Sequence, residues 1–336
     1  MKQSKHPAVY VQTNESGGNR VIAFRREDDG SLSEIGTYDT GGRGDGKPHL
    51  TSQGSVVLSA DGSQLLVTNS GSGDLSVFAV DAGGLSLVDT IATGSAPKSV
   101  AEHAGLVYVL NTEKPSLVGF RLDGLERIGE LALPDGSDPA QVGFAPDGGS
   151  LVVTDRGTDA IVQFSVDDAG RLGDGRVSPS AGPTPYGFVF AGDTLVVTEA
   201  FGAAKGKAAA SSYRFDAGEA TPVSRSIGNG RSEICWAVAT ADGRYAFTTN
   251  FADGAVSRWA IAGDGSITLE DATAGVAVDG QPGLRDEDLT GDGRFLYAID
   301  ADSRRVFGWA VRSGGTLDPV GSWADLPASV AGLAAS

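Results

Sequence analysis

Short runs of apolar residues that end in Asn, Asp or Glu recur along the whole chain. There are seven of them, at Ala8–Asn14, Leu65–Asn69, Val107–Asn111, Leu151–Asp155, Leu195–Glu199, Tyr245–Asn250 and Phe295–Asp300. Their last residues lie 42 to 55 positions apart. A repeat of this length that is built from short strands is typical of the four-stranded blade of a β-propeller.

Glycine turns and further apolar runs surround each copy. Most copies follow a turn such as Asp61-Gly62 or Asp292-Gly293, and Asp-Gly favours the tight turn of a hairpin. An apolar run before that turn predicts a first strand, and the recurring run is the second. A third strand such as Leu75–Val80 alternates polar and apolar residues, as half-buried strands do. A weaker outer strand follows, for example at Leu85–Asp89.

The two ends of the chain complement each other. The first copy, Ala8–Gln12, lacks a first strand before it, and Ser329–Leu333 has the first-strand pattern with nothing after it. We expect these segments to pair, because a closed ring leaves no exposed sheet edge. The sequence therefore predicts an all-β, seven-bladed β-propeller with four-stranded blades, in which residues 1–336 form one domain.

Composition narrows the classes of partner. The formal net charge of −17 makes nucleic acid and anionic membranes poor partners. One cysteine, Cys235, excludes an intramolecular disulfide, and the polar N-terminus has no signal-peptide pattern. We expect a soluble cytoplasmic protein, with a monomer favoured, that acts on a small molecule.

The strongest anomaly is the run Arg285-Asp286-Glu287-Asp288, which occupies a first-strand position that is apolar in the other copies. Charges on an innermost strand are costly to bury unless they are paired or bound to a ligand. One interpretation is a site at the channel mouth, with Glu287 or Asp286 as a proton-transferring residue and Arg285 as an anion ligand. The alternative is a solvated channel wall. Asp286, Glu287 and Asp288 could also bind Ca²⁺ or Mg²⁺.

Two loops add candidates. In Gly228–Trp236, Glu233 offers another carboxylate, and Arg231 and Trp236 could contact a substrate; Cys235 has no neighbouring histidine and is better read as buried and inert. In the loop 41–53, His49 is a candidate general acid or base, since its ordinary pKa lies near neutrality. Lys47 and Gln53 flank His49 as candidate substrate ligands.

The remaining candidates stand where strands enter or leave the same end of the ring. Gln141 and Tyr186 begin first strands. The Asn and Asp residues that end the second strands are expected to close the following turns through the backbone. Glu199 fits that role least, and it precedes a loop, residues 200–212, whose glycines, alanines and lysines suggest a mobile flap.

The segments Val9–Glu15, Asp61–Asn69 and Phe144–Gly148 resemble the propeller lactonase family, which includes bacterial 6-phosphogluconolactonase and fungal carboxymuconate-lactonising enzymes. The resemblance covers nearly the whole ring. Many members carry a Gly-Pro-Arg-His segment at a first strand. Here Lys47-Pro48-His49 is the nearest match, and the chain has three histidines in all. The family's catalytic residues therefore cannot be transferred, and a sugar-phosphate substrate is in doubt.

The resemblance implies a hydrolase of lactones, or a related lactonising isomerase, that acts on a small polar or anionic molecule. Such chemistry needs proton transfer and charge stabilisation, so no cofactor is required. The alternative function is a non-catalytic propeller that binds a protein partner or small ligand on its top face.

Overall fold

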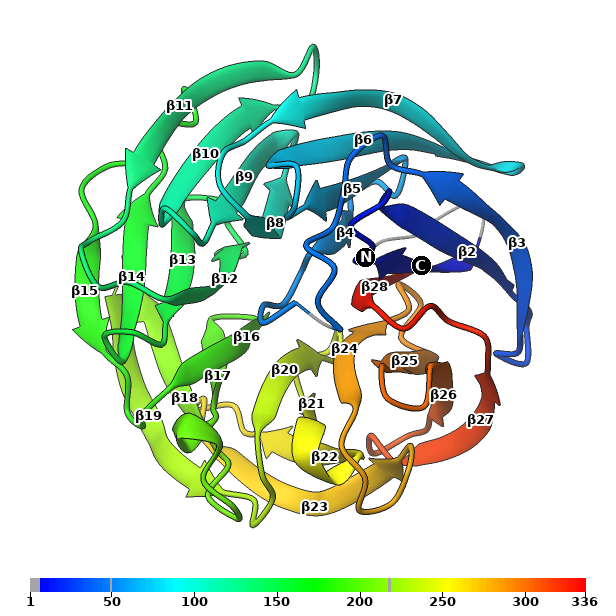
Figure 1. The fold of residues 1–336 in the computed structure, drawn as a ribbon. Coiled ribbons are helices and arrows are strands. Elements are labelled where there is room, and N and C mark those ends of the chain that lie inside the picture. Colours follow the sequence, from blue (N-terminus) through cyan, green and yellow to red (C-terminus); the bar gives the residue numbers. More distant parts are fainter. Residues whose placement is uncertain (1–6, 49, 217–218) are drawn as a thin grey trace.

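The seven recurring apolar runs form the second strands of seven four-stranded antiparallel sheets, arranged as the blades of a β-propeller (Figure 1). The computed structural model describes residues 7–48, 50–216 and 219–336. The second strands are β1 (Ala8–Thr13), β5 (Gln64–Asn69), β9 (Leu106–Asn111), β13 (Ser150–Asp155), β17 (Thr194–Glu199), β21 (Tyr245–Asn250) and β25 (Phe295–Asp300). The predicted fold class is confirmed.

The other strands complete the blades around these. The innermost strands are β4 (Val56–Leu58), β8 (Pro97–His103), β12 (Pro139–Phe144), β16 (Pro185–Ala191), β20 (Ile234–Ala239), β24 (Leu284–Leu289) and β28 (Val330–Ala335). The third strands are β2 (Arg20–Arg26), β6 (Asp74–Asp81), β10 (Ser116–Arg121), β14 (Ala160–Ser165), β18 (Ala209–Asp216), β22 (Ala255–Ile261) and β26 (Arg305–Val311). The outer strands are β3 (Leu32–Asp39), β7 (Gly84–Ala92), β11 (Glu126–Ala132), β15 (Arg176–Pro179), β19 (Glu219–Gly228), β23 (Ile267–Val276) and β27 (Leu317–Trp323). Two short 3₁₀ turns are η1 (Phe201–Ala203) and η2 (Phe251–Asp253).

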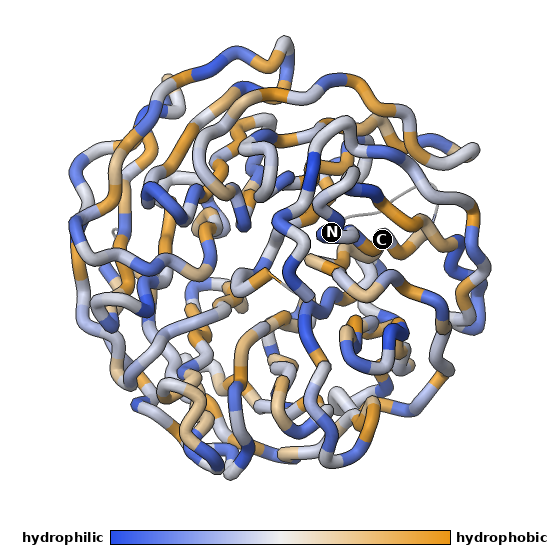
Figure 2. Tube along the Cα trace, viewed as in Figure 1, coloured by the Kyte–Doolittle hydropathy of each residue, from blue (hydrophilic) through white to orange (hydrophobic). Residues whose placement is uncertain are grey.

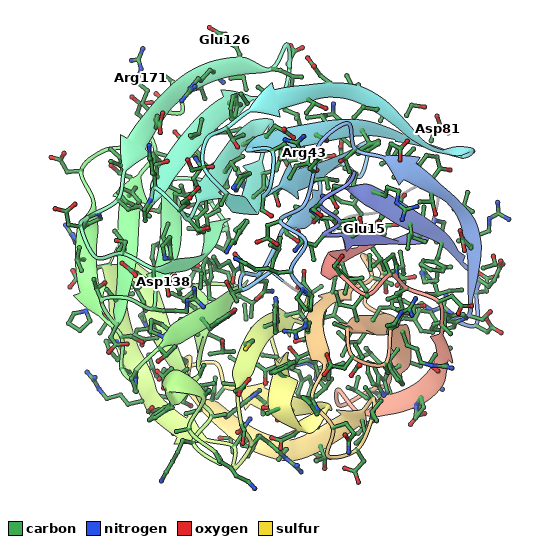
Figure 3. All side chains as sticks on the ribbon, in the orientation of Figure 1. Glu15, Arg43, Asp81, Glu126, Asp138 and Arg171 are labelled. Atoms are coloured by element: carbon green, nitrogen blue, oxygen red, sulfur yellow. The ribbon has the colours of Figure 1, made fainter. Side chains whose placement is uncertain are left out.

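The apolar core lies between adjacent blades. Second strands are almost wholly buried, whereas outer strands such as β11 are largely exposed. One core cluster joins Val11 of β1 with Ile299 of β25 and Leu333 of β28. Apolar segments run through the blades in Figure 2, and the exposed charged residues Asp81, Glu126 and Arg171 lie at the periphery in Figure 3. Each blade therefore buries both faces against its two neighbours.

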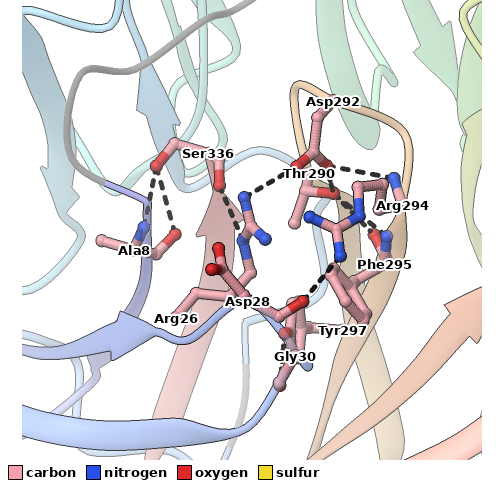
Figure 4. A network of polar contacts seen from close by, with 10 residues as sticks. All are labelled: Ala8, Arg26, Asp28, Gly30, Thr290, Asp292, Arg294, Phe295, Tyr297 and Ser336. Atoms are coloured by element: carbon pink, nitrogen blue, oxygen red, sulfur yellow. Dashed lines mark hydrogen bonds and ion pairs between the residues drawn. The ribbon is translucent and has the colours of Figure 1, made fainter.

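The last strand closes the ring as expected. β28 pairs with β1 in antiparallel register, with Tyr10 opposite Ala334 and Val11 opposite Leu333. Figure 4 shows the end of this pairing, where the Ala8 N–H donates to the Ser336 hydroxyl (3.0 Å). The buried Arg26 guanidinium donates to the Ser336 carbonyl (3.3 Å) and pairs with Asp292 (2.9 Å).

The free edges of the innermost strands are bound by side chains of neighbouring blades. The amide of Gln141 exchanges two hydrogen bonds with the backbone of Phe188, at 2.6 and 3.1 Å. The carboxylate of Asp286 accepts from the Leu333 N–H at 3.2 Å, and that of Asp288 accepts from the Ala335 N–H at 2.9 Å. These contacts satisfy backbone groups that the sheets leave unpaired.

The segment between β3 and β4 crosses the middle of the ring (Figure 1). We call residues 50–55 the plug. Leu50 and Ser52 are buried, the Ser52 hydroxyl donates to the Ala140 carbonyl of β12, and the Gly54 carbonyl accepts from the Val100 N–H of β8 at 2.8 Å. The plug thus leads into the second blade and contacts the innermost strands of the third and fourth blades.

The loop after β17 is shorter than the expected segment 200–212. Ala209–Ser212 form the first half of β18, because they pair with β17. The rest of the loop is bound to the next blade: the Gly206 N–H donates to Ser232 (2.9 Å) and the Ala208 N–H donates to the Arg231 carbonyl (3.0 Å).

Three of the polar residues that end the second strands bond the backbone of the turn that follows, as predicted, whereas Asn69 and Asn111 donate to side chains and, for Asn111, to the Thr93 carbonyl. Asp155 accepts from the Gly157 N–H (2.9 Å), Asn250 donates to the Ala255 carbonyl (3.0 Å), and Asp300 accepts from the Ser303 N–H (2.7 Å). Within the described residues, no helix is long and apolar enough to cross a membrane.

Candidate functional site

Bulges at the start of the innermost strands gather side chains at one end of the ring. The register of these strands shifts between Pro97 and Ser99 in β8, and again near the start of each innermost strand through β24. A bulge bends the strand and redirects a side chain, and bulges are common beside active sites. The residues in these bulges include Lys98, Ala140, Tyr186, Cys235 and Arg285.

Arg285 is a buried cation without a hydrogen-bonding or ion-pair partner among the described residues. Its side chain is 4% exposed, and its guanidinium carbon lies 4.2 Å from the centre of the Phe251 ring. Within the described part of the chain it has no hydrogen bond and no ion pair, and its Nε is buried and unsatisfied. Burial lowers its pKa, while the negative charge of Asp302 opposes that shift. An unpaired buried charge is costly, which indicates a place for an anion.

Glu233 lies beside this arginine and is the residue that directly precedes β20. Its φ of +56° is a left-handed conformation that non-glycine residues rarely adopt. Its backbone carbonyl accepts from the Phe251 N–H at 2.9 Å. Burial raises the pKa of Glu233; the charge of Arg285 lowers it, and that of Asp253 raises it. A half-buried carboxylate with a raised pKa is suited to accept a proton.

Aromatic rings and further cations surround the two residues. The rings of Tyr186 and Trp236 lie 5.7 Å apart, and the Arg156 guanidinium lies 4.9 Å from the centre of the Tyr186 ring. Arg156 is also paired with the exposed Asp138 at 2.7 Å. The pKa of Lys98 is lowered, first by burial and then by the charge of Lys47. Lys98 and Arg285 thus each lie within electrostatic range of Arg156 or of Tyr186, on a chain whose formal net charge is −17.

Cys235 is unsuited to act as a nucleophile. Burial raises the pKa of its thiol to about 12, so the thiol is protonated near neutrality. Its Sγ donates to the Glu233 carbonyl at 3.3 Å. This agrees with the expectation of an inert residue.

The carboxylates of β24 face the two neighbouring blades, one on each side. Asp286 and Asp288 both bind the backbone of β28, whereas Glu287 faces Thr249 of β21. Glu287 is 2% exposed, and neither of its oxygens has a hydrogen-bond partner of ordinary geometry among the described residues. Burial raises the pKa of Asp286 and of Glu287 well above the ordinary value. Neither buried carboxylate is freely accessible from the channel mouth.

The expected divalent-cation ligands do not converge. A strand directs successive side chains to opposite faces, which separates Glu287 from Asp286 and Asp288. No group of three or more His, Cys, Asp or Glu residues that could hold a metal is found in the part of the chain that the structure describes.

Other predicted ligands already have partners. Both ends of the Gln53 and Gln141 amides are bound to backbone groups. Glu199 is fully buried and accepts from the hydroxyls of Ser211 and Ser226. Lys47 is mostly exposed and lies 3.4 Å from Asp45, and Arg231 is half-buried. His49 lies outside the described residues.

The structure adds two residues that the sequence analysis missed, Arg156 and Phe251. Each directly follows the polar residue that ends a second strand, Asp155 or Asn250. A residue at that position could be selected from the sequence as a site candidate, because the chain leaves the sheet there at the end of the ring where the site residues gather.

Similar solved structures share this architecture at low sequence identity. A protein from Bacteroides fragilis, provisionally named a 6-phosphogluconolactonase, is 19% identical with a TM-score of 0.76, over 99% of both chains. The periplasmic gluconolactonase of Pseudomonas aeruginosa is 17% identical with a TM-score of 0.74, over 98% of both chains. A protein of unknown function from Desulfotomaculum acetoxidans is 15% identical with a TM-score of 0.78, over 98% of this chain and 99% of the other. At such identities these likenesses show the fold.

No curated protein matches the chain. A family model does match, over residues 3–127 and 195–330, which is well over half of the sequence, and it describes a lactonase built as a seven-bladed β-propeller. The chain therefore belongs to the seven-bladed β-propeller lactonase family.

Proposed function

We propose that the protein hydrolyses a small anionic lactone at the channel mouth, with Arg285 as the anion ligand. The observation that carries this proposal is the buried Arg285 guanidinium, which lacks a hydrogen bond or ion pair to any described residue. Membership of a lactonase family and the gluconolactonase names of similar structures support the reaction class.

In the proposed reaction Glu233 acts as the general base. It removes a proton from water as the water oxygen attacks the lactone carbonyl carbon. Arg285 binds the anionic group that the lactone carries and so holds the carbonyl carbon within reach of that water. The ring C–O bond breaks, and the proton on Glu233 passes to the departing alkoxide to give a hydroxy acid. Cys235 takes no part, because its pKa of about 12 keeps it protonated.

Two features favour an anionic substrate. Arg156 adds positive charge near Tyr186, which also lies within electrostatic range of Arg285, and Lys98 lies within range of Arg156; Asp138, which is paired with Arg156, offsets part of this charge. The whole chain carries a formal net charge of −17. A cationic mouth on an acidic protein concentrates the attraction for an anion at one place.

The experiment is proton release in a pH-stat with plain, carboxylated and phosphorylated lactones. We expect Arg285→Met and Glu233→Gln each to lower kcat/KM by about 100-fold, as is usual when a buried charge pair with the substrate or a general base is lost. Arg43→Met is the matched control, because Arg43 is an exposed loop arginine. Turnover unchanged in Arg285→Met would refute the assignment. Ligand binding without turnover in the wild-type protein would favour a non-catalytic binding propeller instead.

A further inference from the structure

Gln53 of the plug binds the innermost strand of a blade on the far side of the ring. Its Nε2 donates to the Ala237 carbonyl at 2.8 Å, and its Oε1 accepts from the Ala237 N–H at 3.1 Å. The side chain is 8% exposed. One amide thus satisfies both backbone groups of a residue 184 positions away, on the free edge of β20.

Two neighbouring contacts also hold the plug against β20 and β16. The buried Trp236 indole donates to the Ser52 carbonyl at 3.3 Å. A Cβ on Gly187 of β16 would lie 2.4 Å from Gln53 Oε1 and 2.3 Å from the Cys235 carbonyl. Glycine at position 187 therefore allows β16, β20 and the plug to approach this closely.

The plug also contacts the first and seventh blades. A Cβ on Gly332 of β28 would lie 2.3 Å from Ser55 Oγ, and the Gly54 backbone lies close enough to the Asp286 carboxylate of β24 to lower its pKa. Together with its contacts to β8 and β12, these contacts bring the plug close to the innermost strands of all six remaining blades.

We propose that Gln53 is a positioning residue for the channel-mouth site. The strand that it holds begins with the bulge of Cys235 and Trp236, directly after Glu233. Without the two amide hydrogen bonds the β20 edge is free to move, and Glu233 and Trp236 move with it relative to Arg285. The effect of Gln53 on catalysis rests on the proposed function. Its effect on the position of β20 can be measured separately.

Cys235 provides the separate measurement. It is the one cysteine in the chain, it is 7% exposed, and it lies in the bulge that Gln53 holds. Its rate of alkylation by a maleimide in the native protein therefore reports how firmly β20 is held. Glu102→Leu is the control, because Glu102 of β8 also makes two hydrogen bonds to backbone groups, the N–H groups of Ala60 and Gly105, at the end of the strand away from the bulges.

We expect Gln53→Leu to raise the alkylation rate at least about 10-fold, and Glu102→Leu to change it less than about 2-fold. With a lactone that the wild-type protein hydrolyses, Gln53→Leu should lower kcat about 10-fold with little change in KM, while Glu102→Leu retains kcat. A purely structural role predicts similar losses of melting temperature in both variants and no difference in alkylation or kcat, and that result would overturn the proposal.

Gln53→Met is a second variant if Gln53→Leu does not fold. It keeps the length of the side chain but makes neither hydrogen bond to Ala237, and it should also speed alkylation of Cys235. An unchanged rate in that variant would contradict the proposal. If the wild-type protein hydrolyses no lactone, the proposed function fails, while the alkylation rates still decide whether Gln53 holds β20.

Discussion

The carboxylate of Asp286 on β24 accepts a hydrogen bond from the backbone N–H of Leu333 on β28, at 3.2 Å. The contact joins the last blade to the strand that closes the ring. It also accounts for a charged residue on an innermost strand, since Asp286 supplies an acceptor to an N–H that no sheet partner satisfies.

Replacing Asp286 by Ala should destabilise the protein. The Leu333 N–H then loses its acceptor in a buried place, which costs about 1 to 3 kcal/mol. Urea unfolding at pH 7 measures this change in the free energy of unfolding. Ser33→Ala is the control, because Ser33 lies on the exposed face of outer strand β3. A loss no larger than that of the control would contradict the assigned role.

Glu287 should make stability depend on pH. Its pKa in the folded protein is raised well above 4.5 by burial and by the charges of Asp286 and Asp288. The folded state therefore binds the proton more tightly than the unfolded state. The resulting stability is fully present below pH 4.5 and is lost as pH rises toward the folded pKa.

Glu287→Gln removes this titration. We expect the variant to be more stable than the wild-type protein at pH 8, with a flatter dependence of the unfolding free energy on pH above 4.5. Urea midpoints between pH 5 and 8 test this. An unchanged slope would show that Glu287 is ionised in the folded state.

Deletion of residues 327–336 should open the ring. The deletion removes β28 and with it the backbone pairing to β1 and the acceptor of the Arg26 hydrogen bond. The innermost edge of the first blade is then exposed to water and to other chains. Calorimetry should show a loss of the cooperative transition or a much lower melting temperature; an unchanged transition would refute closure by this strand.

Cys235→Ala should retain lactone hydrolysis within about 3-fold. The thiol is buried and its pKa is about 12, so a thiolate is essentially absent at neutral pH. Initial rates on the substrate found in the pH-stat panel provide the measurement. A loss of 100-fold or more would assign a covalent role to this residue and contradict the proposed mechanism.

The periodic part of the fold could be predicted from the sequence, because one strand pattern recurs seven times and the ends complement each other. The site was less predictable. The sequence drew attention to Arg285 by its anomalous place on an innermost strand, and alternation along that strand puts Asp286 and Glu287 on opposite faces, but the sequence could not show which segments those faces contact. That outcome depends on a bulge and on packing between distant segments. Gln53 was a candidate by its loop, while its partner Ala237 lies 184 residues away.

The central claim is that Arg285 binds the anionic group of a lactone. The most direct test compares kcat/KM for a carboxylated or phosphorylated lactone with that for its neutral analogue, in wild-type protein and in Arg285→Met. The account predicts a preference for the anion of at least about 10-fold in the wild-type protein, worth about 1.4 kcal/mol, and its loss in the variant. A preference that survives in Arg285→Met, or that is absent from the wild-type protein, would contradict it.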